Sequence, residues 1–302
     1  MDIKKALQTD DSGQYLIPEK LAAGITELAE QASPLRKLIK RIPWTTNAYE
    51  WTERSALAST DWYSENASFS ASESTYTRKS KTVKMLKVEG TVSNLLIKTS
   101  RDYIPALQAE IEGASKSIAM AEEEAIITGD SSSDSDQIDG LYKQITQQVD
   151  AEGGVITFDL LDEAIRAVRL YNGIPGLIVV SPRDLDKLIK TVRDAGYYLP
   201  FEKATAIGNM EIRLAKYQGI PVLSTPFIPT DLDSSQATPE SDCSYAFVLD
   251  LNEIVIAEVL PLTYEEVAVT TDGKSFRIKE YIALAVKAAG KKHCTIINIG
   301  KE

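Results

Sequence analysis

Only a few side chains in this sequence have the chemistry and the spacing that catalysis would need. His293 is the one histidine, and it stands next to Cys294, one of two cysteines. A histidine can activate a thiol as a nucleophile, but neighbouring residues of a strand point to opposite faces of a sheet. We therefore expect both side chains to be structural. A single histidine also excludes a metal site built from several histidines.

Adjacent glutamates occur at Glu122-Glu123-Glu124 and again at Glu265-Glu266. Paired carboxylates can perform acid–base chemistry, which keeps a carboxylate-dependent hydrolase as a distant alternative. Adjacent side chains diverge on a helix and alternate between the faces of a strand. We therefore interpret both runs as solvated charged faces.

A cluster of aspartates, Asp130, Asp134, Asp136 and Asp139, lies in a serine-rich stretch. It lacks the spacing, the central glycine and the terminal glutamate of a calcium-binding EF-hand loop, so a solvated, flexible loop is the better interpretation. The chain also lacks the glycine-rich nucleotide motifs, the zinc-protease motif and the hydrolase nucleophile motif. The sequence therefore predicts no catalytic residue, no metal ligand and no cofactor.

Composition excludes further classes of protein. The 302 residues include 33 Lys and Arg against 44 Asp and Glu, a net charge of −11. Such an acidic chain is poorly suited to gripping nucleic acid through its phosphates. A hydrophobic content of 43% favours a globular fold. The chain lacks an 18-residue apolar run and a secretory signal, so we expect a soluble protein with no membrane partner.

The first half of the chain predicts an arm, a helix and a long ribbon. The first 15 residues are polar, a helix begins near Pro18 and ends at Pro34, and residues 36–53 have a strand-like composition. Residues 54–77 predict a long projecting loop. The alternation from Thr77 to Ile97 predicts a returning strand, with a bulge near Glu89-Gly90. A ribbon of this kind has little core of its own, so it needs a surface outside itself.

The strongest helix prediction follows the ribbon. Ser100 can cap it, Pro105 suits an early position, and an apolar stripe runs from Leu107 to Ala125 before Gly129. After Gly153-Gly154 helices and strands alternate, which indicates a compact mixed lobe inserted before C-terminal strands. Helices are predicted at 160–171 and 182–195, and strands at 177–180, 220–224, 245–249, 253–259, 265–269, 276–286 and 294–299. The fold class is therefore α+β.

Charge changes sign sharply along the chain. Residues 78–88 contain five basic residues and no acid, whereas residues 101–150 contain eleven acids and three basic residues. Lysines on an exposed strand can simply prevent aggregation at a sheet edge. Alternatively, the basic ribbon of one subunit lies across the acidic helix region of its neighbour. The candidate contact residues between subunits are Trp62, Glu65, Arg78, Lys79, Lys81, Lys84, Lys87, Glu110, Glu112, Glu122 and Glu123.

Several strings, taken in order, resemble the major capsid proteins of tailed phages with the Hong Kong 97-type fold. A Trp-x-x-Glu string from Trp62 to Glu65, a lysine-bearing ribbon and a long helix ending in Gly129-Asp130 are specific in combination. The resemblance extends over essentially the whole chain. The other matching strings are Gly13-Gln14-Tyr15-Leu16-Ile17-Pro18, Ser33-Pro34-Leu35-Arg36, Ser72 to Tyr76, Leu95 to Asp102, and Ile138-Asp139-Gly140-Leu141.

The resemblance implies a structural shell subunit, not an enzyme, with an N-terminal arm, an extended β-ribbon loop, a peripheral domain with a spine helix and an inserted axial α/β domain. The implied ranges are 1–42 for the arm, 43–94 for the extended loop, 95–150 for the peripheral domain, 151–262 for the axial domain and 263–302 for returning strands. Pentamers and hexamers would enclose double-stranded DNA without binding it specifically, in a virion assembled in the host cytoplasm. Portal, scaffolding or decoration proteins are further implied partners.

Two departures limit the transfer from this family. No scaffolding segment precedes the arm in this sequence, so we expect scaffolding to be separate, dispensable or outside the given sequence. Some members join an extended-loop lysine covalently to an asparagine of a neighbour, but no matching asparagine or glutamate motif is found here. We therefore expect no covalent cross-linking. An encapsulin-like nanocompartment shell is the alternative function, because it shares the fold.

Overall fold

The computed structural model describes residues 34–68, 71–99, 106–194, 201–203, 213–233, 242–267 and 272–301. Residues 1–33, which include the helix predicted from Pro18 and most of the predicted arm, lie outside the described residues. Ser100 and Pro105 lie outside them too. The chain forms two compact units. The first comprises Met1–Leu38, Met85–Glu123 and Leu260–Tyr281, and the second comprises Ile39–Lys84, Glu124–Val259 and Ile282–Glu302.

The long helix α4 (Ala106–Thr128) supplies one side of the core of the first unit. Ile111 and Ile118, two turns apart on one face, pack against Phe276 and Ile278. These two partners belong to the long strand β12 (Gly273–Val286), which lies in a four-stranded sheet of order β1-β11-β12-β4. The 23 residues of α4 confirm the predicted long helix, which is about 34 Å long at ~1.5 Å per residue.

The other three strands of that sheet are β1 (Lys40–Pro43), β4 (Lys84–Ser93) and β11 (Ile254–Val267). β1 pairs with β11 in parallel, from Lys40 opposite Val255 to Pro43 opposite Glu258. Two short helices, α2 (Pro34–Leu38) and α3 (Asn94–Thr99), also belong to the first unit, whereas β1, β11 up to Val259 and β12 from Ile282 belong to the second.

A seven-stranded mixed sheet of order β5-β13-β10-β6-β9-β8-β7 organises the second unit. Its central strands β6 and β10 are entirely buried and, apart from Ser244 and the Tyr245 hydroxyl, apolar, as expected where both faces of a sheet are covered. Its strands are β5 (Gln148–Asp150), β6 (Leu177–Val180), β7 (Phe201–Lys203), β8 (Arg213–Tyr217), β9 (Ile220–Ser224), β10 (Ser244–Leu249) and β13 (Cys294–Ile299).

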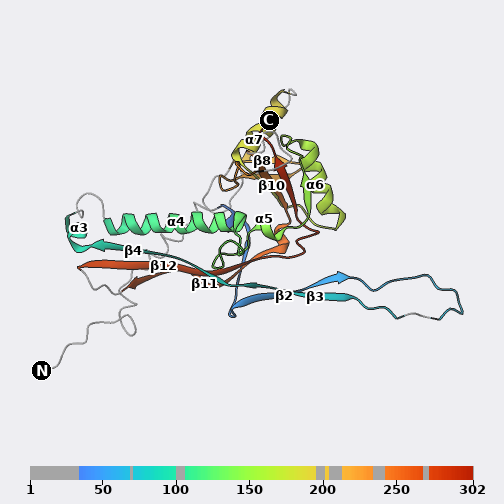
Figure 1. Cartoon of the computed structure of the whole chain (residues 1–302), viewed down its shortest axis with the longest axis horizontal. Coiled ribbons are helices and arrows are strands. Elements are labelled where there is room, and N and C mark those ends of the chain that lie inside the picture. The colour runs from blue at the N-terminus through green and yellow to red at the C-terminus, as the bar shows by residue number, and fades with distance from the viewer. Residues whose placement is uncertain are drawn as a thin grey trace. The chain divides into compact units, whose positions relative to one another are not determined.

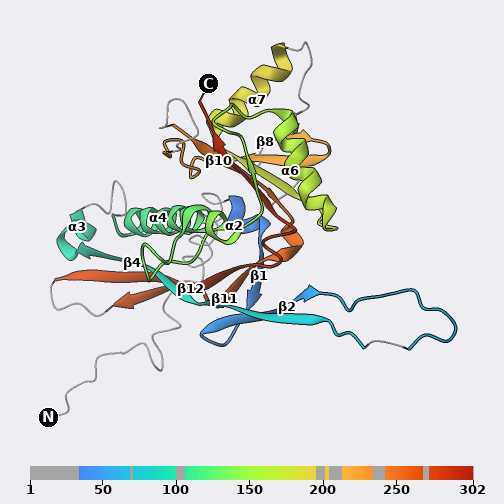
Figure 2. The same cartoon turned by 45° about the vertical axis from the view of Figure 1, so that its right-hand side comes forward.

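Two amphipathic helices, α6 (Phe158–Leu170) and α7 (Pro182–Asp194), flank this sheet, and α6 packs against β13 and β10 (Figure 2). The hydroxyl of Thr157 caps α6 by accepting a hydrogen bond from the Leu160 amide. The short helix α5 (Leu141–Gln144) and a 3-10 turn at Leu251–Glu253 complete the unit. The described residues contain no helix that is long and apolar enough to cross a membrane.

A separate two-stranded sheet in the second unit is the predicted ribbon. β2 (Ala48–Ala56) pairs antiparallel with β3 (Thr75–Thr82), and residues 57–74 join the two strands. Figure 1 shows this pair continuing into a long loop that leads away from the rest of the unit. The extended ribbon predicted from the sequence is thus confirmed.

Several local predictions around the ribbon are wrong. The returning strand is two strands, since β3 ends at Thr82 and β4 enters a different sheet. Side-chain burial alternates without a break along β4, so there is no bulge at Gly90. Gly90 instead takes an inward position beside Phe276, where a Cβ atom would lie 2.5 Å from the ring.

Other differences concern helix and strand ends. Pro34 begins α2, and the helix predicted to end there lies outside the described residues. Residues 94–97 are helical because Asn94 starts α3. The strands predicted at 253–259 and 265–269 are one strand, β11. The short strands β5, β7 and β8 were not predicted, since they have only three to five residues.

Candidate functional site

Within the described part of the second unit, most of the ribbon packs little against its own chain. All residues of β3 except Lys81 are exposed, and so is nearly every described residue of the loop between β2 and β3. Trp62 in that loop has the exposure of an isolated side chain, at 104%. A large aromatic ring left in water is a frequent anchor of protein interfaces. Trp62 and Glu65, two predicted contact residues, are therefore both accessible.

Aromatic packing holds the base of the ribbon. Tyr49 is buried on Val255, Ala257, Ala283 and Ala285 of the two long strands. Trp44 and Trp51 pack beside this cluster, with the Trp44 ring 4.9 Å from the Tyr49 ring. The base of the ribbon is therefore fixed, whereas its tip has no such support.

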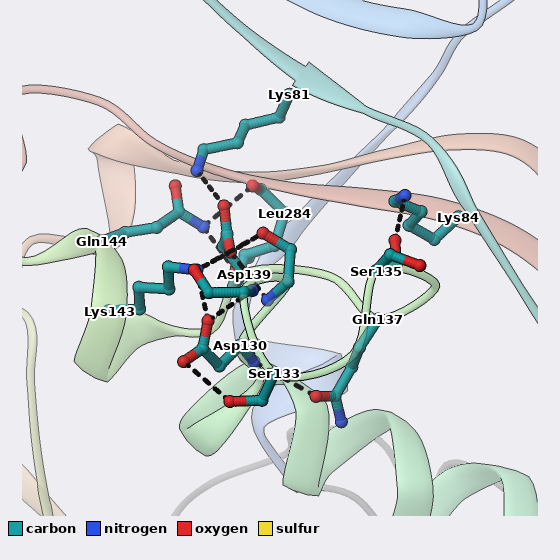
Figure 3. Close-up of polar contacts among 12 residues, drawn as sticks. Lys81, Lys84, Asp130, Ser133, Ser135, Gln137, Asp139, Lys143, Gln144 and Leu284 are labelled. Atoms are coloured by element: carbon teal, nitrogen blue, oxygen red, sulfur yellow. Dashed lines mark hydrogen bonds and ion pairs between the residues drawn. The ribbon is translucent and has the colours of Figure 1, made fainter.

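The carboxylate of Asp139 is the centre of a polar anchor for the ribbon (Figure 3). Lys81 of β3 donates from Nζ to Oδ2 of Asp139 at 2.7 Å. The other oxygen accepts from the amide and the hydroxyl of Ser131, at 3.1 and 2.6 Å, and pairs with Lys143 at 3.1 Å. This one side chain therefore joins the ribbon to the loop of residues 130–139.

The same loop also contacts the first residue of β4, which follows the ribbon. Lys84 donates to the carbonyl oxygen of Ser135 at 2.5 Å, and Gln144 donates to the carbonyl of Asp139 at 2.6 Å (Figure 3). Asp130 pairs with Lys143 and accepts from the Ser132 amide. This aspartate-rich loop is hence hydrogen-bonded at both ends, while residues 132–136 are exposed to solvent as expected.

The pKa values of Asp139 and Asp130 are lowered by these contacts. Burial alone would raise the pKa of Asp139, but the hydrogen bonds from Lys81, Ser131 and Lys143 outweigh it and hold the pKa far below its usual range. The Lys143 ammonium and the Ser132 amide lower the pKa of Asp130 to about 2. Both carboxylates are therefore ionised at neutral pH.

Replacing Asp139 with asparagine should release the ribbon's base. The change removes a charge-assisted hydrogen bond to Lys81, so we expect the free energy of unfolding to fall by about 1–2 kcal/mol, reduced by partial exposure. Limited proteolysis should then cut the ribbon faster. Lys81→Met should have the same effect, and an unchanged cleavage rate in both variants would contradict the anchor.

Protonation of Asp139 at low pH should weaken the ribbon anchor, as the Asp139→Asn substitution does. A carboxyl group with a depressed folded pKa stabilises the fold above its unfolded value of about 3.9, and this contribution is lost as the pH falls toward the folded pKa. Stability of the wild-type subunit should therefore fall more steeply below about pH 4 than that of Asp139→Asn. Denaturant titrations at several pH values measure the difference, and parallel curves would contradict it.

Glu53 makes a second anchor, which sequence reasoning missed. Its Oε1 accepts from the Trp51 indole at 2.7 Å and from the Ala288 amide at 2.8 Å, while Lys79 pairs with Oε2 at 2.9 Å. Burial opposes ionisation, yet these donors hold the pKa of Glu53 below its ordinary value. An acid in this strand, with no motif around it, gave no sign of this role.

The five predicted basic residues, three in β3 and two in β4, have partners within their own chain. Arg78 pairs with Glu50 across the ribbon, and Lys87 lies 3.5 Å from Glu89. With Lys79, Lys81 and Lys84 engaged as described, none of the five basic side chains is free of a polar contact. A role for them between subunits remains a prediction.

The predicted acidic contact residues of α4 divide into two groups. Glu110 is exposed and Glu112 is half-buried, so both can meet another molecule. Glu122 and Glu123 are completely buried, and only Glu124 of that run is exposed. The interpretation of the three glutamates as a solvated face is therefore wrong, and the two buried ones offer no surface to a neighbour in this conformation.

A buried cation explains how Glu122 is tolerated in the first unit. Arg36 of α2 is 7% exposed and places Nε 3.0 Å from Glu122 and Nη2 3.0 Å from Glu280 of β12. Buried carboxylates require such partners, because their charge is costly to desolvate. Nothing in the local pattern around Arg36 pointed to this arrangement.

His293 and Cys294 are structural, as the sequence suggested. The buried imidazole accepts from the Asp250 amide at Nδ1 and donates from Nε2 to the Lys287 carbonyl. Burial lowers the pKa of His293 and raises the pKa of the Cys294 thiol to about 12, so both groups are neutral. Within the described ranges, no group of three or more potential metal-ligating side chains occurs.

Comparison with known proteins adds sequence and fold relationships to this geometry. The model of the phage capsid family matches residues 13–290. No curated protein sequence matches the chain.

Solved structures with this fold include three shell assemblies. The capsid of a native GTA particle is 17% identical, with a TM-score of 0.67 over 88% of this chain and 89% of that one. The cyanophage A-1(L) capsid is 12% identical, with a TM-score of 0.68 over 89% and 93%. The SrpI encapsulin of Synechococcus elongatus PCC 7942 is 14% identical, with a TM-score of 0.67 over 88% and 87%. At these identities the likeness shows the fold, which is the Hong Kong 97 type that the sequence predicted.

Proposed function

This chain belongs to the phage capsid family and is a major capsid protein, and we propose that its copies form the pentamers and hexamers of an icosahedral head. In this proposal the head encloses double-stranded DNA without binding it specifically, assembles in the host cytoplasm and has no catalytic turnover. The acidic net charge of −11 supports the weak-binding part, because a wall that repels phosphates lets packed DNA move.

The observation that carries the proposal is the exposed ribbon. Its base is anchored by Tyr49, Glu53 and Asp139, whereas its tip presents Trp62 to solvent. A thin two-stranded ribbon gains too little from its own contacts to be stable alone. Identical neighbours that cover this tip would supply the missing contacts, and many modest contacts repeated by symmetry can hold a shell.

The assignment of residues to parts of the subunit belongs to the same proposal. Residues 1–42 would be the arm, 43–94 the extended loop, 95–150 the peripheral domain with α4 as its spine, 151–262 the axial domain and 263–302 the returning strands. The seven-stranded sheet supports an axial lobe with its own core. Portal, scaffolding and decoration proteins would act on the assembled shell, with no membrane partner.

Among the contact residues, Trp62 and Glu65 at the tip and Glu110 on α4 are exposed, whereas Glu112 is half-buried. The lysines of the ribbon's base would support assembly indirectly, because they hold the ribbon in place within their own chain. Reversal of Lys81 to glutamate would thus set two carboxylates together at Asp139 and loosen the ribbon.

Shortening the ribbon tests the proposal. Ala56 lies opposite Thr75, so a two-residue Asn-Gly turn can replace residues 57–74 and close the hairpin. We expect the purified wild-type protein to form closed shells in electron micrographs and the shortened variant to form none. Its unfolding midpoint should match that of the wild type, because the deleted side chains that are described are almost all exposed. Normal shells from the shortened variant would contradict the role of the tip.

An encapsulin-like nanocompartment is the second candidate, which the fold of the SrpI encapsulin favours. The contents of purified particles distinguish the two, since a phage head holds DNA and a nanocompartment holds a protein cargo. A carboxylate-dependent hydrolase has less support, because Glu122 and Glu123 are sealed from solvent. Monomeric protein with measurable turnover would favour that hydrolase over any shell.

A further inference from the structure

A groove of about 500 Å³ lies at the ribbon's base, entirely within the second unit. One wall comes from β2 and β3, with Trp51 and Lys79 among its residues, and the other from the turn after β12, where Lys287 and Lys291 lie. The groove therefore combines an indole ring with long basic side chains, whose aliphatic stems can cover apolar groups.

The groove carries positive charge that its own acids do not neutralise. Two carboxylates line it, but Glu53 is paired with Lys79 and Glu253 with Lys292. The other cations contact only aromatic faces among the described residues. Arg54 lies 5.4 Å from the Tyr76 ring centre, Lys287 5.6 Å from Tyr49, and Lys291 5.9 Å from Tyr171.

The tip of the ribbon has the opposite charge and an exposed aromatic ring. Residues 57–74 contain three acids and no basic residue. Asp61 and Glu65 bracket Trp62, and both acids are exposed. Neither forms an ion pair with any residue in the described part of the chain. The tip thus offers an aromatic ring between two unmatched carboxylates.

We propose that the ribbon tip of one copy docks in the basic groove of a second copy, with Asp61 and Glu65 against Arg54, Lys287 and Lys291. Trp62 then packs on Trp51 and on the lysine stems. This inference deepens the proposed shell function and rests on it. It also differs from the arrangement expected from the sequence, in which the basic part of the ribbon met an acidic helix.

The occupant is a second copy because the tip cannot return to its own groove. Ser55 and Thr77 line the groove, and the paired strands carry the chain outward from there (Figure 1). Residues 57–65 alone span up to about 30 Å when extended, which directs the tip away from that rim. DNA phosphates would also be attracted to basic side chains, but they would leave the exposed indole uncovered.

A charge exchange tests the docking. Asp61→Lys with Glu65→Lys should reduce the yield of shells at least about tenfold, because like charges then face each other. Lys287→Glu with Lys291→Glu should do the same. The four-residue variant that carries both pairs should recover most of the yield. Charge-conserving controls, Asp61→Glu with Glu65→Asp and Lys287→Arg with Lys291→Arg, should assemble normally.

The outcomes separate this inference from the proposed function. Shells from the wild type and from both reversed pairs would overturn the docking and leave the shell function intact. Loss in both pairs without recovery in the combined variant would also overturn it. A wild-type protein that never forms particles would instead contradict the proposed function itself.

A second measurement uses wild-type particles, so it does not depend on whether any variant folds. A zero-length carbodiimide treatment of wild-type particles should join Asp61 or Glu65 to Lys287 or Lys291 by an amide bond. Particles mixed from isotopically light and heavy subunits should give peptide pairs of mixed label, which proves that two copies are joined. Light-only pairs would place the contact within one chain. Protection of Lys287 and Lys291 by DNA in filled shells but not in empty ones would favour the phosphate occupant. Either result would overturn the proposal.

Discussion

Arg36→Met should lower the free energy of unfolding by about 3–5 kcal/mol, the largest loss expected from any single charge in the described residues. The guanidinium contacts Glu122 and Glu280 at 3.0 Å each, and both carboxylates are completely buried. Methionine fills a similar volume, so the effect reports the loss of the cation and not a large cavity. Urea denaturation of the dissociated subunit measures it.

Two further variants separate charge from packing. Arg36→Lys keeps a positive charge but cannot contact both carboxylates with one planar group, so its loss should be intermediate. Adding Glu122→Gln to Arg36→Met should recover part of the stability, since fewer buried charges then lack this partner. A loss below about 1 kcal/mol in Arg36→Met would show that the guanidinium is not needed.

Gly140→Ala should cost at least about 3 kcal/mol, the upper part of the range for overpacking. A Cβ atom there would lie 2.6 Å from the Gly129 nitrogen, 2.8 Å from the Ala125 oxygen and 2.9 Å from the Ile127 carbonyl carbon. All three are backbone atoms at the end of α4, and they cannot rotate aside. The Gly140 amide also donates to the Gly129 carbonyl at 2.7 Å, so the two segments are held in register.

The Gly140→Ala substitution should also loosen the ribbon. Gly140 follows Asp139 directly, so movement of the backbone would shift the carboxylate that holds Lys81. The variant should therefore show faster proteolysis of the ribbon as well as a lower melting temperature. Gly113→Ala is the matched control, because a Cβ atom there has nothing within 4 Å. It should raise stability by about 0.5–1 kcal/mol, as alanine suits the interior of a helix better than glycine. Equal effects at both glycines would contradict the packing argument.

The periodic parts of this protein could be predicted from the sequence because burial repeats along them. Leu107, Ile111 and Ile118 recur at helical spacing, so α4 was predictable, and the apolar run at Leu177–Val180 indicated a central strand. The order of these elements, together with the Trp62 to Glu65 string, was enough to place the chain in its family. The long polar ribbon was also predictable, since no apolar stripe could have buried it in its own core.

Only the tertiary structure determines which partners the charged residues have. In the sequence Glu122 and Glu123 look like part of a solvated run, because the sequence does not show which residues of a distant segment pack against them. Arg36, 86 positions earlier in the chain, turns that run into a buried cluster. Likewise Lys81 meets Asp139 across 58 residues and Glu53 meets Ala288 across 235. Local spacing determines helices and strands, whereas the partner of a charge is set by how those elements pack.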